Sequence, residues 1–145
     1  KTRALSIRVH GAAEQYLTYS AGKLAPHSWF NEGYGDFFSG AKISGGKVKK
    51  IGPNPWRVAT IKEAVEMRRH IPLEEIIRYE QSDYYGRNRG LCYAEGWSLI
   101  YFLNTSKDVA KNEHWAAILP TYFETLKSAW GEQLEIGRAS CRERG

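Results

Sequence analysis

The sequence predicts a mainly α-helical (α+β) domain with one small β-hairpin. Apolar residues recur at helical spacing in most segments between glycine and proline residues, most clearly in 91–103. A single Gly45-Gly46 pair separates two short β-type segments and predicts the hairpin. With 145 residues, of which 42% are hydrophobic and 13% aromatic, the chain is long and apolar enough for one folded domain.

The first part of the chain predicts two helices joined by a short turn. Residues 5–21 follow the helical pattern, and Gly22 is a favourable residue just beyond a helix. Ser28 is the expected N-cap of a helix over 29–39, which Gly40 ends. The hairpin follows directly.

The rest of the chain predicts further helices after a rigid connector, IGPNPW. Residues 58–69 repeat apolar side chains at helical spacing, and Pro72 can open a short helix within PLEEIIRYE because proline is tolerated in a first turn. The segment 81–90, QSDYYGRNRG, is predicted to be a loop. The most apolar helix covers 91–103, and an amphipathic helix runs from about 112 to 130.

The last eleven residues, EIGRASCRERG, differ from the pattern before them. They lack helical or strand periodicity and resemble the conceptual translation of sequencing-adapter read-through. We therefore predict a folded unit over 1–134 and a non-native tail over 135–145. Without the tail's three arginines and two glutamates the net charge falls from +5 to +4, and Cys92 is left as a single cysteine, which gives no disulfide framework.

The positive net charge alone does not indicate a nucleic-acid partner. The densest basic segment, KISGGKVKK, is interpreted as the hairpin with its lysines toward solvent. Nucleic-acid binding through this hairpin is the minor alternative. Because we favour solvated lysines, we expect no nucleic-acid partner. No segment has the roughly eighteen apolar residues of a membrane span, so we also expect no membrane span.

A partial metal-site pattern begins at His10. In an H-E-x-x-H helix two histidines at i and i+4 reach one Zn²⁺, and the glutamate activates the metal-bound water as general base. Here the five residues read H-G-A-A-E, so Gly11 takes the place of the base and Glu14 that of the second histidine. Glu32, on the next predicted helix, matches a carboxylate third ligand, and Asp36 one turn on can accept the spare N–H of a ligand histidine.

Three longer segments carry a resemblance to a known family. They read HSWFNEGYGDFF, IPLEEIIRYEQSDYY and LCYAEGWSLIYFL, and they resemble the gluzincin side of the zincin metallopeptidases, in particular the peptidase MA-like domains of uncharacterised bacterial proteins. In those relatives the segment VHGAAEQY would read V-H-E-x-x-H-Q-Y. The resemblance covers about 7–130 and implies a zincin-like helical subdomain over 1–134 that is truncated at both ends.

The resemblance also assigns site residues by position. His10 and Glu32 match zinc ligands, Asp36 matches the acid that orients a ligand histidine, and Glu14 stands where the second histidine is expected. Gly11 occupies the position of the catalytic base. The family also implies a group that stabilises the transition state, either a tyrosine phenol or a histidine.

Tyr93 or Tyr84 could supply that phenol. The competing interpretation makes Tyr93 a core aromatic residue and Tyr84 a loop residue. His27, in the turn before the second predicted helix, could approach a metal, but a capping or solvated role is the alternative we favour.

These substitutions predict a pseudo-enzyme. General-base assistance is worth roughly 10²–10⁴-fold in rate, and Gly11 cannot supply it. A set of one histidine and two carboxylates is harder and more anionic than the family's set, so zinc binding should be weakened or lost. We expect an inactive metallopeptidase-like domain that binds a peptide or a cell-envelope component, in an extracytoplasmic bacterial parent protein.

Two alternatives remain open at this point. The domain could be a working zinc-dependent peptidase or hydrolase with His10, Glu14 and Glu32 as ligands and a displaced base. The segment GAAE could also be a reading error in the sequence of an active enzyme.

Overall fold

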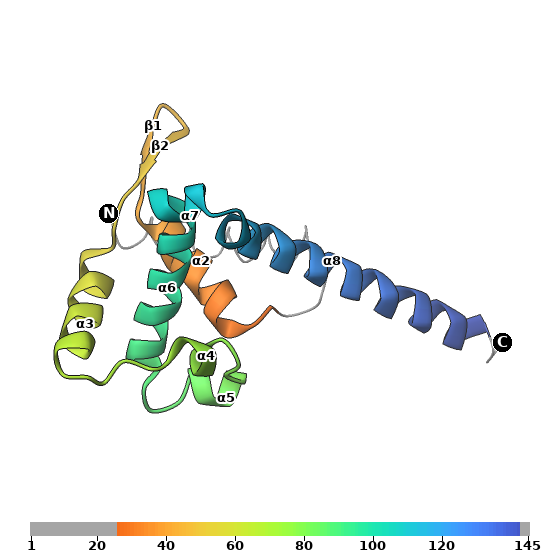
Figure 1. The fold of residues 1–145 in the computed structure, drawn as a ribbon. Coiled ribbons are helices and arrows are strands. Elements are labelled where there is room, and N and C mark those ends of the chain that lie inside the picture. Colours follow the sequence, from red (N-terminus) through yellow and green to blue (C-terminus); the bar gives the residue numbers. More distant parts are fainter. Residues whose placement is uncertain (1–25, 143–145) are drawn as a thin grey trace.

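The computed structural model describes residues 26–142, with the backbone alone for 135–142. Within this range the chain is mainly helical with one two-stranded antiparallel hairpin, which confirms the predicted fold class (Figure 1). The helix predicted over 5–21 lies outside the described residues.

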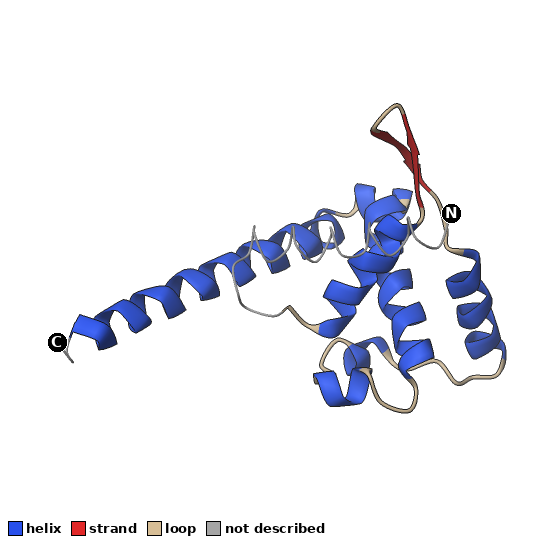
Figure 2. Ribbon diagram, turned by 180° about the vertical axis from the view of Figure 1, so that it is seen from behind, coloured by secondary structure: helices blue, strands red, loops and turns tan. Residues whose placement is uncertain are grey.

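The described elements follow one another with short connections, and the same arrangement is seen from behind in Figure 2. In chain order they are α2 (Ser28–Ser39), β1 (Ala41–Ser44), β2 (Lys47–Ile51), α3 (Pro55–Glu66), α4 (Leu73–Ile76), α5 (Gln81–Tyr84), α6 (Arg89–Thr105), α7 (Lys107–Lys111) and α8 (Glu113–Arg142).

Helix α6 forms the centre of the helical body. It packs most extensively against α2 and α3 and also contacts α5, α7 and α8. Its buried side chains meet those of α2 in one apolar core, where each fully buried large apolar side chain contributes about 1.5–3 kcal/mol. The core residues of these two helices are Trp29, Phe30, Phe37, Cys92, Trp97 and Ile100.

Two glycines allow α2 and α6 to approach closely. A Cβ atom placed on Gly33 would lie 2.6 Å from the carbonyl oxygen of Gly96 and 2.6 Å from Cγ1 of Ile100. A Cβ on Gly96 would lie 3.0 Å from the carbonyl oxygen of Trp29. The two backbones are therefore closer than any side chain at these positions would permit.

The hairpin has the turn that its sequence predicts. Gly45 and Gly46 have φ angles of 58° and 73°, in the left-handed region that glycine adopts without strain. The strands pair antiparallel with Ser44 opposite Lys47, and a bulge interrupts the register between Lys42 and Ile43. Every residue from 42 to 50 is exposed, so the lysines do face solvent.

Helix α3 begins three residues earlier than predicted, at Pro55. The Oδ1 atom of Asn54 accepts hydrogen bonds from the N–H groups of Trp56 (3.1 Å) and Arg57 (3.4 Å), and proline fits the first helical position. This cap sets the start of the helix.

We predict that Asn54→Ala lowers the free energy of unfolding by about 1 kcal/mol, because the cap satisfies two N–H groups of the first turn. Urea unfolding followed by circular dichroism measures the loss. Asn88→Ala is the matched control, since Asn88 precedes α6 without a side-chain capping bond. Equal losses in the two variants would contradict the capping role of Asn54.

Two local predictions are wrong, and one short helix was missed. Ser28 is buried inside α2 and the N-cap is His27, which makes no side-chain capping bond. The predicted loop 81–90 contains the short helix α5 and the start of α6 at Arg89. The short helix α7 was not predicted; Ser106 caps it through Oγ, which accepts from the N–H of Asp108 at 3.1 Å.

Helix α8 continues to Arg142, well past the predicted end at about residue 130. No proline follows Trp130, and the glycines in the segment each cost a helix only about 1 kcal/mol relative to alanine. The prediction that this helix ends at about residue 130 is therefore wrong, while the prediction of a non-native tail over 135–145 stays a prediction. Among the described helices, α8 included, none is both long enough and apolar enough to cross a bilayer.

Candidate functional site

Helix α2 brings two of the predicted site residues onto one face. Glu32 and Asp36 are one turn apart, and the Glu32 side chain is buried, with 5% of its surface exposed. The other predicted positions at this site, His10, Gly11 and Glu14, lie outside the described residues.

Tyr85 holds the Glu32 carboxylate. Its hydroxyl donates a hydrogen bond to Oε1 of Glu32 at 2.6 Å, and Tyr85 itself is the C-cap residue that follows α5. Charge-assisted bonds of this length are stronger than neutral ones, and burial increases the effect. The contact joins α2 to α5 across 53 positions in sequence.

Tyr93, on α6, belongs to the same cluster. Its ring centroid lies 6.2 Å from that of Tyr85 and 5.7 Å from that of Tyr84. Burial, followed by the negative charge of Glu32, raises the pKa of Tyr93 far above its usual value. Tyr93 is therefore a neutral phenol that can donate a hydrogen bond near Glu32 at any physiological pH.

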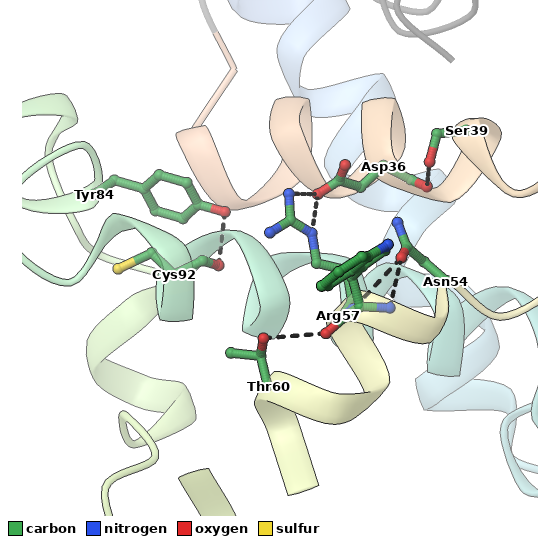
Figure 3. Close-up of polar contacts among 8 residues, drawn as sticks. Asp36, Ser39, Asn54, Arg57, Thr60, Tyr84 and Cys92 are labelled. Carbon is green, nitrogen blue, oxygen red and sulfur yellow. Dashed lines mark hydrogen bonds and ion pairs between the residues drawn. The ribbon is translucent and has the colours of Figure 1, made fainter. Parts of the chain in front are cut away.

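Tyr84 has a structural role. It is fully buried, and its hydroxyl donates to the carbonyl oxygen of Cys92 at 2.9 Å (Figure 3). Burial is also the main cause that raises its pKa. The prediction that Tyr84 is a loop residue is wrong, because it belongs to α5 and to the core.

Asp36 is held by an arginine that sequence reasoning did not identify. The Nη2 and Nε atoms of Arg57 lie 2.7 Å and 2.8 Å from Oδ2 of Asp36 (Figure 3). The guanidinium carbon is 5.1 Å from the centroid of the Tyr93 ring, a favourable cation–π distance. Arg57 thus joins α3 to α2 and contacts α6.

The described part of the site therefore consists of two acids, two phenols and one guanidinium. Glu32 fits a metal ligand in two respects: it is buried, and a hydrogen bond fixes one of its oxygens. Among the described residues, no three of the His, Cys, Asp and Glu side chains come together as a metal-binding group. A complete zinc site would need donors from the predicted positions His10 and Glu14.

His27 contacts α8 instead of the acids. Its Nδ1 lies 2.7 Å from the hydroxyl oxygen of Tyr122, and its backbone N–H donates to the same oxygen at 2.9 Å. This contact connects the start of α2 to α8.

A further partly buried carboxylate, Glu95, lies on α6, away from Glu32 and Asp36. Its Oε1 accepts a hydrogen bond from the backbone N–H of Ile71 at 2.7 Å, and burial raises its pKa. Glu95 lines a groove between α3, α4 and α6 and provides a matched control for experiments on Glu32.

Sequence reasoning found the acids of α2 but missed Tyr85 and Arg57. The signal for Tyr85 was a pair of aromatic residues in a polar segment, Tyr84-Tyr85, where aromatic residues are unexpected unless they are buried or bonded. For Arg57 no local spacing rule applies, because its partner lies 21 positions away.

Comparison of the chain with protein-family models, with curated proteins and with solved structures finds no match.

Proposed function

We propose that this chain is a gluzincin-type metallopeptidase-like domain whose catalytic centre is inactive, and that it binds a peptide or a cell-envelope component. The observation that supports the proposal best is the buried Glu32 carboxylate, fixed by Tyr85 and placed one turn before Asp36. A buried carboxylate is costly to a fold, so its presence favours a functional origin for this arrangement.

In this proposal each described residue of the site has a separate role. Glu32 offers a fixed carboxylate oxygen to a cation, and Tyr85 keeps that carboxylate in place. Tyr93 adds a second phenol beside Glu32 and contacts the ring of Tyr85. A bound zinc ion would supply Lewis-acid chemistry, but Gly11 removes the side chain that would act as base.

Zinc titration by calorimetry at neutral pH tests this proposal on the full chain. We expect weak or no zinc binding by the unmodified chain and stoichiometric binding by Gly11→Glu/Glu14→His, which restores the family pattern. Adding Glu32→Gln to the restored variant should weaken binding by more than the roughly 10- to 100-fold that loss of an outer hydrogen-bond partner costs. Glu95→Gln, as the control, should leave zinc affinity unchanged.

Two outcomes would contradict the proposal in different ways. A restored variant that folds but fails to bind zinc would overturn the zincin assignment. Hydrolysis of a labelled peptide by the unmodified chain, abolished by Glu32→Gln, would overturn the inactive assignment and favour a working site with His10, Glu14 and Glu32.

A further inference from the structure

The β1–β2 hairpin stands out from the helical body, and its register separates its side chains into two faces (Figure 1). Directly opposed residues of an antiparallel pair share a face, and neighbours along a strand alternate. Lys42 pairs with Lys50 and Ser44 with Lys47, so these residues lie on one face. Their apolar neighbours lie on the other.

The first face concentrates positive charge. It carries Lys42, Lys47 and Lys50, and Lys49 is the extra residue of the bulge beside them. Residues 41–51 contain four lysines and no acid, and none of these lysines takes part in an ion pair with another described residue. Like charges directly opposite each other, as Lys42 and Lys50 are, destabilise a hairpin.

The second face is apolar and exposed. Ile43 and Val48 are cross-strand partners, and they remain 45% and 57% exposed. Trp56, which follows the hairpin after a short connector, is 84% exposed. A basic face backed by a small apolar face, with a tryptophan nearby, is the composition of elements that lie in the interface of anionic bilayers.

Nucleic acid is the weaker match for this surface. The hairpin has no arginine, asparagine or glutamine to read base edges, and Trp56 is a single nearby ring rather than a series on which successive bases could stack. The exposed aliphatic pair would gain nothing from a phosphate backbone, whereas it gains burial at a lipid interface.

We propose that the hairpin is a docking element for an anionic lipid surface. The lysines contact headgroup phosphates and carboxylates, while Ile43 and Val48 enter the boundary between headgroups and acyl chains. Contact with the lipid compensates the repulsion between Lys42 and Lys50 and covers the two exposed aliphatic side chains. The inference does not depend on the metal-site residues.

Co-sedimentation of the full chain with lipid vesicles tests the proposal. We expect binding to phosphatidylcholine vesicles that contain phosphatidylserine, no binding to phosphatidylcholine alone, and weaker binding as salt is raised. Each lysine beside an anionic surface multiplies the partition coefficient about five-fold, so replacing all four hairpin lysines by glutamine should weaken binding by about tenfold if only one or two contact the surface and by up to several hundred-fold if all four do. Ile43→Ser/Val48→Ser should weaken it several-fold at unchanged charge.

The matched control removes four exposed positive charges elsewhere, with Lys62→Gln/Arg87→Gln/Lys107→Gln/Lys111→Gln. This variant should keep most of the vesicle binding. Equal losses in the control and the hairpin variant would show that net charge alone drives binding and would overturn the proposal. Tight binding to duplex DNA, with vesicle binding unaffected by Ile43→Ser/Val48→Ser, would show that the hairpin binds any polyanion through its charge and would also overturn the proposal. Absence of vesicle binding at low salt would leave the lysines as protection of exposed strand edges, which also overturns it.

Discussion

Gly33→Ala is expected to lower the free energy of unfolding by about 3 kcal/mol, the upper part of the range for overpacked cores. The new methyl group would meet the Gly96 carbonyl oxygen and Ile100 Cγ1 at 2.6 Å each. Backbone cannot move aside as a flexible side chain can, so α2 and α6 would have to separate. The gain of about 1 kcal/mol in helix propensity from alanine offsets only part of this cost.

Gly131→Ala is the matched control for this prediction. Gly131 also lies inside a helix, α8, but a Cβ there would meet no other atom within 4 Å. The Gly131→Ala substitution should raise the free energy of unfolding by up to about 1 kcal/mol. Urea unfolding of both variants decides the matter: if Gly33→Ala is as stable as Gly131→Ala, the close approach of α2 and α6 is wrong.

Arg57→Leu is expected to lower the free energy of unfolding by about 2–3 kcal/mol. Breaking a fully buried ion pair costs roughly 3–5 kcal/mol because one charge stays behind in a poor solvent. The side chains of Arg57 and Asp36 are 24% and 13% exposed, so water screens part of that cost. The cation–π contact with Tyr93 is lost in the same variant.

A double-mutant cycle with Asp36→Asn isolates this interaction. The sum of the losses in unfolding free energy of the two single variants should exceed the loss of the double variant by at least about 1 kcal/mol, because residues in one network are energetically coupled. The control pair is Arg69 and Glu63, 3.1 Å apart but 62% and 61% exposed, for which the coupling should not exceed about 0.5 kcal/mol. Coupling as small as this in the Arg57 pair would show that it contributes no more than a surface contact.

The sequence predicted the elements that have clear boundary residues or a clear apolar repeat. Gly40 ends α2, the Gly45-Gly46 pair forms the turn, and the apolar pattern of 91–103 gives α6 within two residues at each end. Errors arose where tertiary contacts override local signals. Segment 81–90 reads as a loop because it is polar, yet burial of Tyr84 folds its first part into α5.

The candidate site was predictable only in part for a related reason. Spacing along one helix placed Glu32 and Asp36 on a shared face, and that relation needs no knowledge of the fold. Tyr85 and Arg57 reach the acids from other helices, 53 and 21 positions away, and no pattern within one element reports such distances. Tyr93 was proposed through family resemblance; it packs against the core and beside Tyr85, and its role at the site stays a prediction.

The base of the hairpin is closed twice. The N–H of Gly52 donates to the carbonyl oxygen of Gly40 at 3.1 Å. The ion pair between Asp36 and Arg57 then joins α2 to α3, the two helices that flank the hairpin. The enclosed segment, residues 41–51, can therefore vary in length and composition while α2 and α3 keep their relative positions. Even doubling the enclosed segment adds only about 0.6 kcal/mol of closure entropy. The hairpin could therefore be exchanged for another segment without altering the helices that carry Glu32 and Asp36.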